Sequence, residues 1–277
     1  MKLPIAVIAA LATLFVLERL FPLRRTTRAL VGRLVINFAL SALTFGVAMV
    51  LVKPAALGAL NWAAHTPFGI LHLFTMPTWL QWVAAFLLFD LSFYYWHVLN
   101  HRVPFLWRFH NVHHFDPDLD VSTGFRFHFG EVAMSSVFRV AQAALIGPTL
   151  EQFLVYELVF QIHTLFEHSN LRLPEKLDRA LRLVFVTPRM HGIHHSQFRD
   201  ETNSNYSVVF SFWDRLHRTV CLGVPQEKVT IGVPGYSASE DNRLWSAVTA
   251  PFREQREYWP ATKLRREPKP DPRSNTS

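Results

Sequence analysis

The sequence has a single cysteine, Cys221, among its 277 residues. One cysteine cannot form an internal disulfide, and it leaves no thiolate cluster for zinc or an iron–sulfur centre. The chain also lacks a His-Glu-x-x-His motif, a glycine-rich dinucleotide fingerprint and a haem attachment motif. Any metal must therefore be held by nitrogen and oxygen ligands.

Acidic residues are fewer than basic ones, 21 against 28, so the formal net charge is +7. A basic chain can bind nucleic acid, but here the basic residues fall in loops and in the C-terminal third, between and after apolar segments. Lipid headgroups are the anions that such an arrangement meets. We therefore expect a membrane and a lipid as partners, and no nucleic acid.

Long stretches have little or no charge, and half of the residues are hydrophobic. The first apolar run is too long for a signal-peptide core and is not followed by a small-residue cleavage site, so we interpret it as a membrane helix. Two further runs are long enough to span a bilayer, and two shorter ones flank Gly147-Pro148, a turn signal. The five predicted membrane segments are residues 4–21, 34–60, 79–99, 132–146 and 150–166.

The last two segments predict an antiparallel hairpin. Each is short for a full span, so two crossings and a thin, partly re-entrant hairpin are both open. Arg139 and Glu157 lie at similar distances on either side of the turn. We expect them to pair, because a charge inside a membrane needs a partner.

Lys and Arg counts in the short loops set the orientation. Arg24, Arg25, Arg28 and Arg33 place the first loop in the cytoplasm, and the uncharged stretch 54–80 lies outside. The sequence thus predicts an all-α integral membrane helical bundle with a cytoplasmic histidine-rich helical cap. We expect N-terminal transmembrane helices in 1–84, a catalytic domain in 85–219 that includes the hairpin at 132–166, and a cytosolic segment in 220–277, disordered beyond Lys263.

Histidine is unusually frequent, with 14 residues, of which eleven lie between His97 and His195. Three clusters have spacings of i, i+4 or i, i+3, i+4, which place the imidazoles of each cluster on one helical face. Thr187 and Pro188 form a helix-start signal before the third cluster. Metal ions would relieve the cost of burying so many imidazoles, and eight ligands exceed one tetrahedral ion, so we predict two metals. The eight residues are His97, His101, His110, His113, His114, His191, His194 and His195.

Other polar residues are weaker candidates. We add His168 and His163 to the ligand set, although His163 points about 140° away from His168 on a regular helix. His128 is open between ligand and hydrogen-bonding partner, and Asp90 is expected to be a buried helper. Side chains that could orient imidazole N–H groups are Glu131, Asp200, Asn203 and Asn205.

These clusters resemble the three histidine boxes of the fatty acid hydroxylase and sterol desaturase superfamily, the membrane histidine-box di-iron oxygenases. The resemblance covers residues 85–219 and includes Arg126-Phe-His128, His168-Ser-Asn170, Asn205-Tyr206 and Trp213-Asp-Arg-Leu216. Ser207, His217 and Arg218 depart from the pattern of many relatives and leave the substrate open. The resemblance implies two non-haem iron ions held by the box histidines, O2 as oxidant, and hydroxylation or desaturation of a lipid such as a sterol or fatty acid.

Electrons for this reaction would come from a separate donor, a ferredoxin or a cytochrome with its reductase, because no redox-cofactor motif is present. The alternatives are a membrane zinc-dependent hydrolase, which would need a general base beside the metal, and a non-catalytic metal-binding membrane protein. The compact chain without a lysine-rich retention tail favours a bacterial inner membrane, with the active site facing the cytoplasm.

Overall fold

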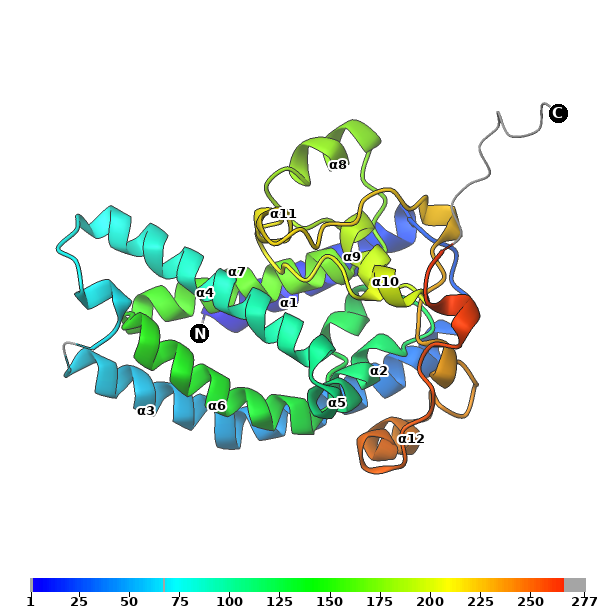
Figure 1. The fold of residues 1–277 in the computed structure, drawn as a ribbon, viewed down its shortest axis with the longest axis horizontal. Coiled ribbons are helices and arrows are strands. Elements are labelled where there is room, and N and C mark those ends of the chain that lie inside the picture. The colour runs from blue at the N-terminus through cyan, green and yellow to red at the C-terminus, as the bar shows by residue number, and fades with distance from the viewer. Residues whose placement is uncertain (1, 67, 267–277) are drawn as a thin grey trace.

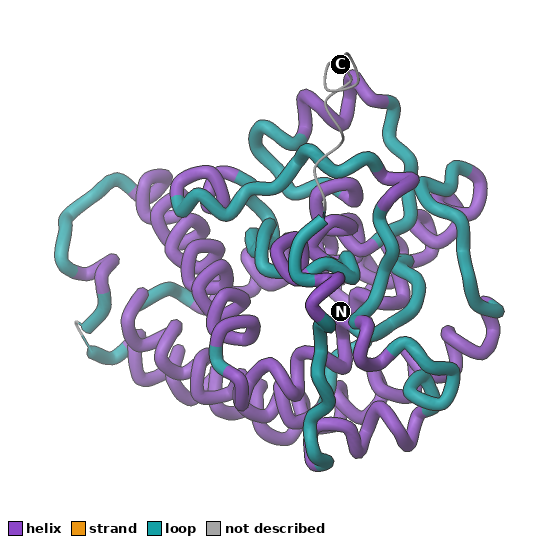
Figure 2. The backbone as a smooth tube through the Cα atoms, turned by 45° about the vertical axis from the view of Figure 1, so that its right-hand side comes forward, coloured by secondary structure: helices purple, strands orange, loops and turns teal. Residues whose placement is uncertain are grey.

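The structure, a computed structural model, describes residues 2–66 and 68–266, with side chains from Pro4 onward. Over these residues the chain is built from helices and loops, with a few isolated bridges and no strand (Figure 2). The prediction of an all-α fold is confirmed.

Five long helices form the main body (Figure 1). They are α1 (Lys2–Leu20), the continuous run α2 (Leu30–Val47), η1 (Ala48–Val52) and α3 (Lys53–Ala64), then α4 (Thr78–Arg102), α6 (Phe129–Ile146) and α7 (Leu150–His168).

Short helices form the cap and the connections. They are η2 (Ile70–His72), α5 (Pro104–His114), η3 (Val121–Phe125), α8 (Glu175–Leu181), α9 (Pro188–His194), α10 (Arg199–Thr202), α11 (Phe212–Leu216), η4 (Gln226–Lys228), η5 (Pro234–Tyr236), α12 (Leu244–Thr249), η6 (Ala250–Phe252) and η7 (Ala261–Lys263).

Three described helices are long and apolar enough to cross a membrane: Leu30–Ala64, Thr78–Arg102 and Phe129–Ile146. The first has 35 residues, longer than the predicted 34–60, and its length of about 50 Å exceeds the hydrocarbon core of a bilayer. Both α1 and α7 are helices where membrane segments were expected. That they also span the membrane stays a prediction.

The turn between α6 and α7 forms as the sequence indicates. Gly147 ends α6 with φ 70°, a left-handed conformation that glycine adopts without a Cβ penalty. Thr149 then begins α7 with a capping box, in which its Oγ1 accepts from the Gln152 N–H at 3.2 Å and Gln152 Oε1 accepts from the Thr149 N–H at 2.9 Å. The chain therefore reverses at this turn, and α6 and α7 run in roughly opposite directions away from it (Figure 1).

Arg139 and Glu157 pair across this hairpin, as expected, with 2.6 Å between Nη1 and Oε1. The guanidinium also donates to Gln142 Oε1 at 3.1 Å and lies 4.3 Å from the centroid of the Phe93 ring on α4. The ion pair thus joins three helices at one point.

Polar contacts fix the loops around the helix ends. Asp90 of α4 is fully buried and accepts from the backbone N–H groups of Val209 and Phe210 and from Trp213 Nε1. Asp90 is therefore the buried helper that was expected. It ties the segment after α10 to α4.

The C-terminal segment packs on the cap. Residues of α12 and η6, including Ala247 and Ala250, share a buried apolar cluster with Trp107 and Val112 of α5 and with Leu40 of α2. The expected disorder after Lys263 concerns mainly residues 267–277, which lie outside the described residues.

Arg139→Met should lower the free energy of unfolding by about 3 kcal/mol or more, because it leaves Glu157 without its cation in a largely buried position. Adding Glu157→Met should restore most of the loss, since replacing a buried ion pair by apolar side chains is often nearly neutral. Thermal unfolding of the detergent-solubilised variants measures both effects. Equal stability of Arg139→Met and the parent protein would show that the pair contributes nothing.

Candidate metal centre

Four elements converge at one end of the bundle: the last turns of α4 and α7, and the short helices α5 and α9 (Figure 1). Val103 is extended and Pro104 occupies the first turn of α5, so the chain reverses directly after α4. The third box begins its helix at Pro188 after Thr187, as predicted, although the Thr187 side chain makes no capping bond. All three boxes therefore lie on helices.

The structure gathers nine imidazoles into two adjoining groups, and within each group the ligand nitrogens lie within 4.8 Å of one another. All eight box histidines are included, and His168 from α7 is the ninth. The first group contains His97, His101, His110, His114 and His194, and the second contains His113, His168, His191 and His195.

Consecutive histidines on one helix enter different groups. His113 and His114 separate in this way on α5, and His194 and His195 do so at the end of α9. The rings of His114 and His195 stack between the groups with centroids 4.3 Å apart. Each of these helical faces thus serves two adjacent sites.

Five imidazoles are oriented by a hydrogen bond at Nδ1. Four acceptors are backbone carbonyls: Tyr206 O for His97 at 2.7 Å, Arg126 O for His113 at 3.2 Å, Thr164 O for His168 at 2.7 Å and Ser204 O for His194 at 2.7 Å. A carbonyl oxygen can only accept, so these Nδ1 atoms carry the hydrogen. The lone pair of each ring is then on Nε2.

The Nε2 atoms converge without ordinary hydrogen-bond partners. Those of His97, His110, His114 and His194 are buried and unpaired, although His97 is only half-buried as a residue. In the second group Nε2 of His168 lies 3.0 Å from that of His113 and 2.9 Å from that of His191. Nitrogens about 2.1 Å from one ion and at right angles to each other would be about 3 Å apart, so this donor set fits a metal ion.

Five imidazoles at α5 and α9 are kept neutral by their surroundings. Burial, reinforced by neighbouring imidazoles, holds the pKa of His113, His114, His191 and His195 well below the usual range. Burial lowers the pKa of His194 to about 3. Neutral imidazole is the form that binds a metal.

Two carboxylates adjoin the groups. Glu131, at the start of α6, accepts from His110 Nδ1 at 2.9 Å, as the sequence suggested. Glu167 is buried, with its oxygens 3.8 Å from His168 Nδ1 and 3.7 Å from His191 Nδ1. The sequence analysis did not single out Glu167, although its place directly before His168 was a usable signal.

The other polar residues suggested for orienting imidazoles are used elsewhere. Asp200 pairs with Arg265 at 2.8 Å, and the Asn203 side chain donates to Arg199 O and accepts from the Tyr206 hydroxyl. Asn205, with φ 51°, bonds the backbone of Met190 and Cys221 and so shapes the turn after α10. None of the three bonds an imidazole of the two groups.

His163 and His128 lie outside both groups. His163 Nε2 is 3.0 Å from Val186 O, and His163 lies on another side of α7 from His168, as the 140° offset implied. Including it among the ligands does not agree with this geometry, so we leave it out of the proposed set. His128 accepts from Gly130 N–H at Nδ1 and donates to Val248 O from Nε2, which is the hydrogen-bonding alternative.

Two buried side chains hold the carbonyls that orient the imidazoles. Asp214 accepts from the backbone N–H groups of Tyr206 and Ser207. Arg126 donates from Nε to Val112 O and from Nη1 to Asn37 Oδ1, at 2.9 Å each. Both lie in motifs that the resemblance includes, and the structure shows what they position.

Arg24, in the loop between α1 and α2, packs on the back of the third box. Its Nη1 donates to Gln226 Oε1 at 2.7 Å and lies 3.4 Å from Pro188 O. The guanidinium rests directly on Gly192, and a Cβ at that position would overlap Nη1. A side chain at position 192 would therefore have to displace either the Arg24 guanidinium or α9.

Gly192→Ala should displace α9 or Arg24, and it should lower both the melting temperature and the amount of metal that the protein retains. Gly223→Ala is the matched control, because a Cβ there meets nothing within 4 Å. Thermal unfolding and elemental analysis of both variants test the contact. Indistinguishable results for the two alanines would show that the overlap is relieved without consequence.

Comparison with known proteins gives relatives that are named as monooxygenases and hydroxylases. The chain is 32% identical over 167 residues to alkylglycerol monooxygenase from Homo sapiens, covering 58% of this chain and 35% of that protein. It is 28% identical over 236 residues to ornithine lipid hydroxylase from Rhizobium tropici, covering 82% and 70%. It is 29% identical over 136 residues to cholesterol 25-hydroxylase from Homo sapiens, covering 48% of each.

The chain thus spans about a third of alkylglycerol monooxygenase and half of cholesterol 25-hydroxylase. No solved structure matches it significantly. The family profile described as fatty acid hydroxylase matches residues 82–219, a segment that contains all nine histidines of the two groups. Through this segment, the chain belongs to the fatty acid hydroxylase family.

Proposed function

We propose that this protein is a membrane-bound, non-haem di-iron oxidoreductase that uses O2 to oxidise a lipid. The observation that carries the proposal is the pair of adjoining histidine groups, five nitrogens in one and four in the other. The named relatives are hydroxylases and monooxygenases, which favours hydroxylation over desaturation. Residues 85–219 would form the catalytic domain, preceded by membrane helices in 1–84 and followed by a cytosolic segment in 220–277.

The donor set favours iron over zinc. Zinc takes four ligands in structural sites and three plus water in catalytic ones, whereas the first group offers five imidazoles. Imidazole suits iron, and a six-coordinate ion would retain open positions in both groups. Neither adjoining carboxylate takes the place of a general base beside the metal: Glu131 is engaged by His110, and Glu167 lies beside the Nδ1 atoms of His168 and His191, not beside their converging Nε2 atoms.

In hydroxylation, a lipid C–H bond and O2 take up two electrons and two protons to give an alcohol and water. Two iron ions, when bound, would supply the activation of O2 that breaks an unactivated C–H bond. The chain's own contribution is to hold neutral imidazoles in fixed orientations and to exclude water. Trp107 contributes to this shielding, since its buried ring lies 4.8 Å from His101 and 5.2 Å from His114 between centroids.

The two electrons would come from a separate ferredoxin, or from a cytochrome with its reductase. The sequence carries no dinucleotide or haem motif that would make the chain its own reductase.

We infer a cytoplasmic active site in a bacterial inner membrane. The arginine-rich loop between α1 and α2 contacts the histidine end of the bundle, for example through Thr27 and Asp118. The uncharged stretch between α3 and α4 is at the other end (Figure 1). Short loops rich in Lys and Arg stay in the cytoplasm. The relative with the longest alignment among the three is bacterial, which supports the membrane assignment.

Purified protein should contain about two irons per chain, as expected for two histidine groups. His113→Ala should lose at least one iron, because it removes one of four nitrogens from the second group. His163→Ala should keep both, because His163 is bonded to a carbonyl outside the groups. Elemental mass spectrometry of the detergent-solubilised variants measures the content.

The activity is tested by incubating membrane lipids with the protein, a reductant and isotope-labelled O2. One labelled oxygen atom per product lipid, absent with His113→Ala, is expected. A single zinc per chain would contradict the di-iron proposal and favour the hydrolase. Two irons without O2-dependent turnover would favour a non-catalytic metal-binding protein.

Glu131→Ala should weaken metal binding by about 10- to 100-fold, as loss of a carboxylate that orients a ligand imidazole commonly does. Glu131→Gln should lose less, because its amide oxygen can still accept from His110 Nδ1. Iron titration of the metal-free protein gives the affinities. Glu151→Ala, an exposed acid in the first turn of α7, is the control, and equal affinity for Glu131→Ala and Glu151→Ala would contradict the role.

A further inference from the structure

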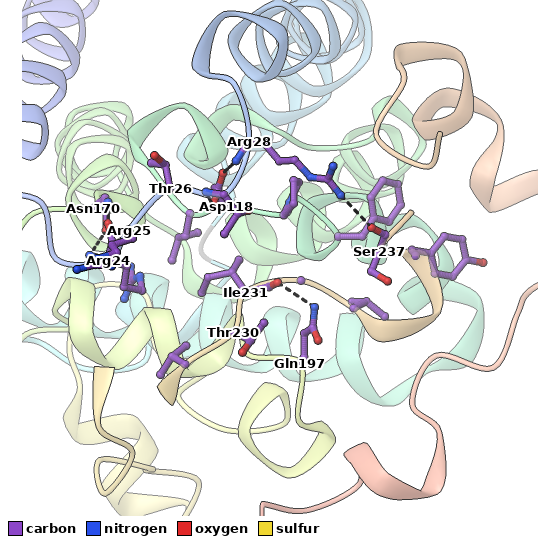
Figure 3. A pocket seen from close by; sticks show the side chains of 18 residues that line it. Arg24, Arg25, Thr26, Arg28, Asp118, Asn170, Gln197, Thr230, Ile231 and Ser237 are labelled. Carbon is purple, nitrogen blue, oxygen red and sulfur yellow. Dashed lines mark hydrogen bonds between the residues drawn. The ribbon is translucent and has the colours of Figure 1, made fainter. Parts of the chain in front are cut away.

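A cavity of about 270 Å³ opens beside the second histidine group on the polar cap (Figure 3). Phe115, Asn170 and Gln197 line it, and each is one or two residues from a histidine of the two groups. The volume is well above the ~10–15 Å³ that one water needs on the same measure. It can therefore hold a small polar group.

Three arginines of one loop line this cavity: Arg24, Arg25 and Arg28. Arg24 and Arg25 lie on one side, and Arg28 reaches across toward Ser237, whose carbonyl accepts from it at 3.4 Å (Figure 3). Among the described residues, no carboxylate lies within 4 Å of any of these guanidinium groups. The loop therefore presents uncompensated positive charge.

The single carboxylate in the lining is already engaged. Asp118 is buried and accepts from the backbone N–H groups of Thr27 and Arg28 at 2.8 and 2.9 Å, and from the Thr27 hydroxyl at 3.0 Å. These bonds fix the loop and orient the backbone, while the side chains of Arg25 and Arg28 stay exposed. The arrangement is a preformed anion site.

Position selects the kind of anion. The loop joins the end of α1 to the start of α2, so it lies where a membrane helix leaves the bilayer. Phosphates of lipid headgroups occupy that level and attract basic segments. Guanidinium groups match the geometry of phosphate oxygens through paired N–H donors.

We propose that this cavity binds a phosphate group, carried by the headgroup of an anionic lipid at the membrane surface. Arg25 and Arg28, both exposed, neutralise the phosphate, and Arg24 adds charge from behind while it positions α9. The site does not depend on the oxidation chemistry, so it can be tested on the protein with or without metal.

The test is binding of phosphatidylglycerol to the full chain in neutral detergent, measured by native mass spectrometry against phosphatidylcholine. Arg25→Gln/Arg28→Gln should weaken phosphatidylglycerol binding by about tenfold or more, as loss of two basic contacts implies. Lys176→Gln/Arg179→Gln on α8 makes the same charge change at exposed residues outside the lining and should leave binding unchanged.

A second variant keeps all three arginines. Ser237→Glu, at an exposed position of the cavity wall, adds a carboxylate beside Arg28 and should weaken binding similarly. Inorganic phosphate at constant ionic strength is the probe for the other source of the anion. If millimolar phosphate competed with phosphatidylglycerol, the result would support a phosphate site in this cavity, with a free anion as its ligand.

Equal losses in the α8 control would mean that binding reflects overall charge, and this would overturn the proposal. The proposal would also be overturned if neither cavity variant changed the binding of phosphatidylglycerol or of phosphate.

Discussion

Nine imidazoles meet at one end of this bundle with their inward nitrogens buried, and the rest of the cap is arranged around the need to keep them neutral and correctly turned. A protonated imidazole in that position would have no solvent to stabilise its charge, and most of its neighbours are other imidazoles that carry no negative charge. A neutral ring has one N–H, and if this hydrogen faced inward the lone pair would be lost to a metal. In five of the nine rings the outward Nδ1 has an acceptor, and the fold supplies these acceptors from several directions.

Most of those acceptors are backbone carbonyls from segments distant from the boxes. The carbonyl of Tyr206, which lies 109 residues after His97 in the sequence, orients the His97 ring. Asp214 holds this segment in place, because its carboxylate accepts from the Tyr206 backbone N–H. Arg126 O orients His113, while the Arg126 side chain reaches Asn37 of α2. The metal centre thus depends on loops after the third box and on a membrane helix before the first. This explains why the spacing of the boxes alone would not make a site, and why the family match continues to residue 219.

The sequence predicted the helices and the box histidines because both rest on local periodicity. Spacings of three and four residues place side chains on one face whatever surrounds the helix, and the apolar runs identify the long helices in the same way. Three of the four carbonyl acceptors could not be predicted, since every residue carries a carbonyl and only tertiary packing selects them, whereas Thr164 O lies one helical turn before His168. The division into two groups also depends on tertiary packing and could not be predicted. Adjacent residues such as His194 and His195 share a helix end but belong to different groups. His163 lies outside both groups for a local reason, because its angular offset from His168 turns it toward Val186.

The loop between α1 and α2 bears on two properties of the protein, its proposed orientation in the membrane and the packing of the third histidine box. The proposed orientation of the helices in the membrane rests on its arginines, since basic loops are retained in the cytoplasm. One of them, Arg24, also rests on Gly192 between two histidines of the third box. The same loop therefore carries both the charge on which the proposed orientation rests and a contact that supports the third box.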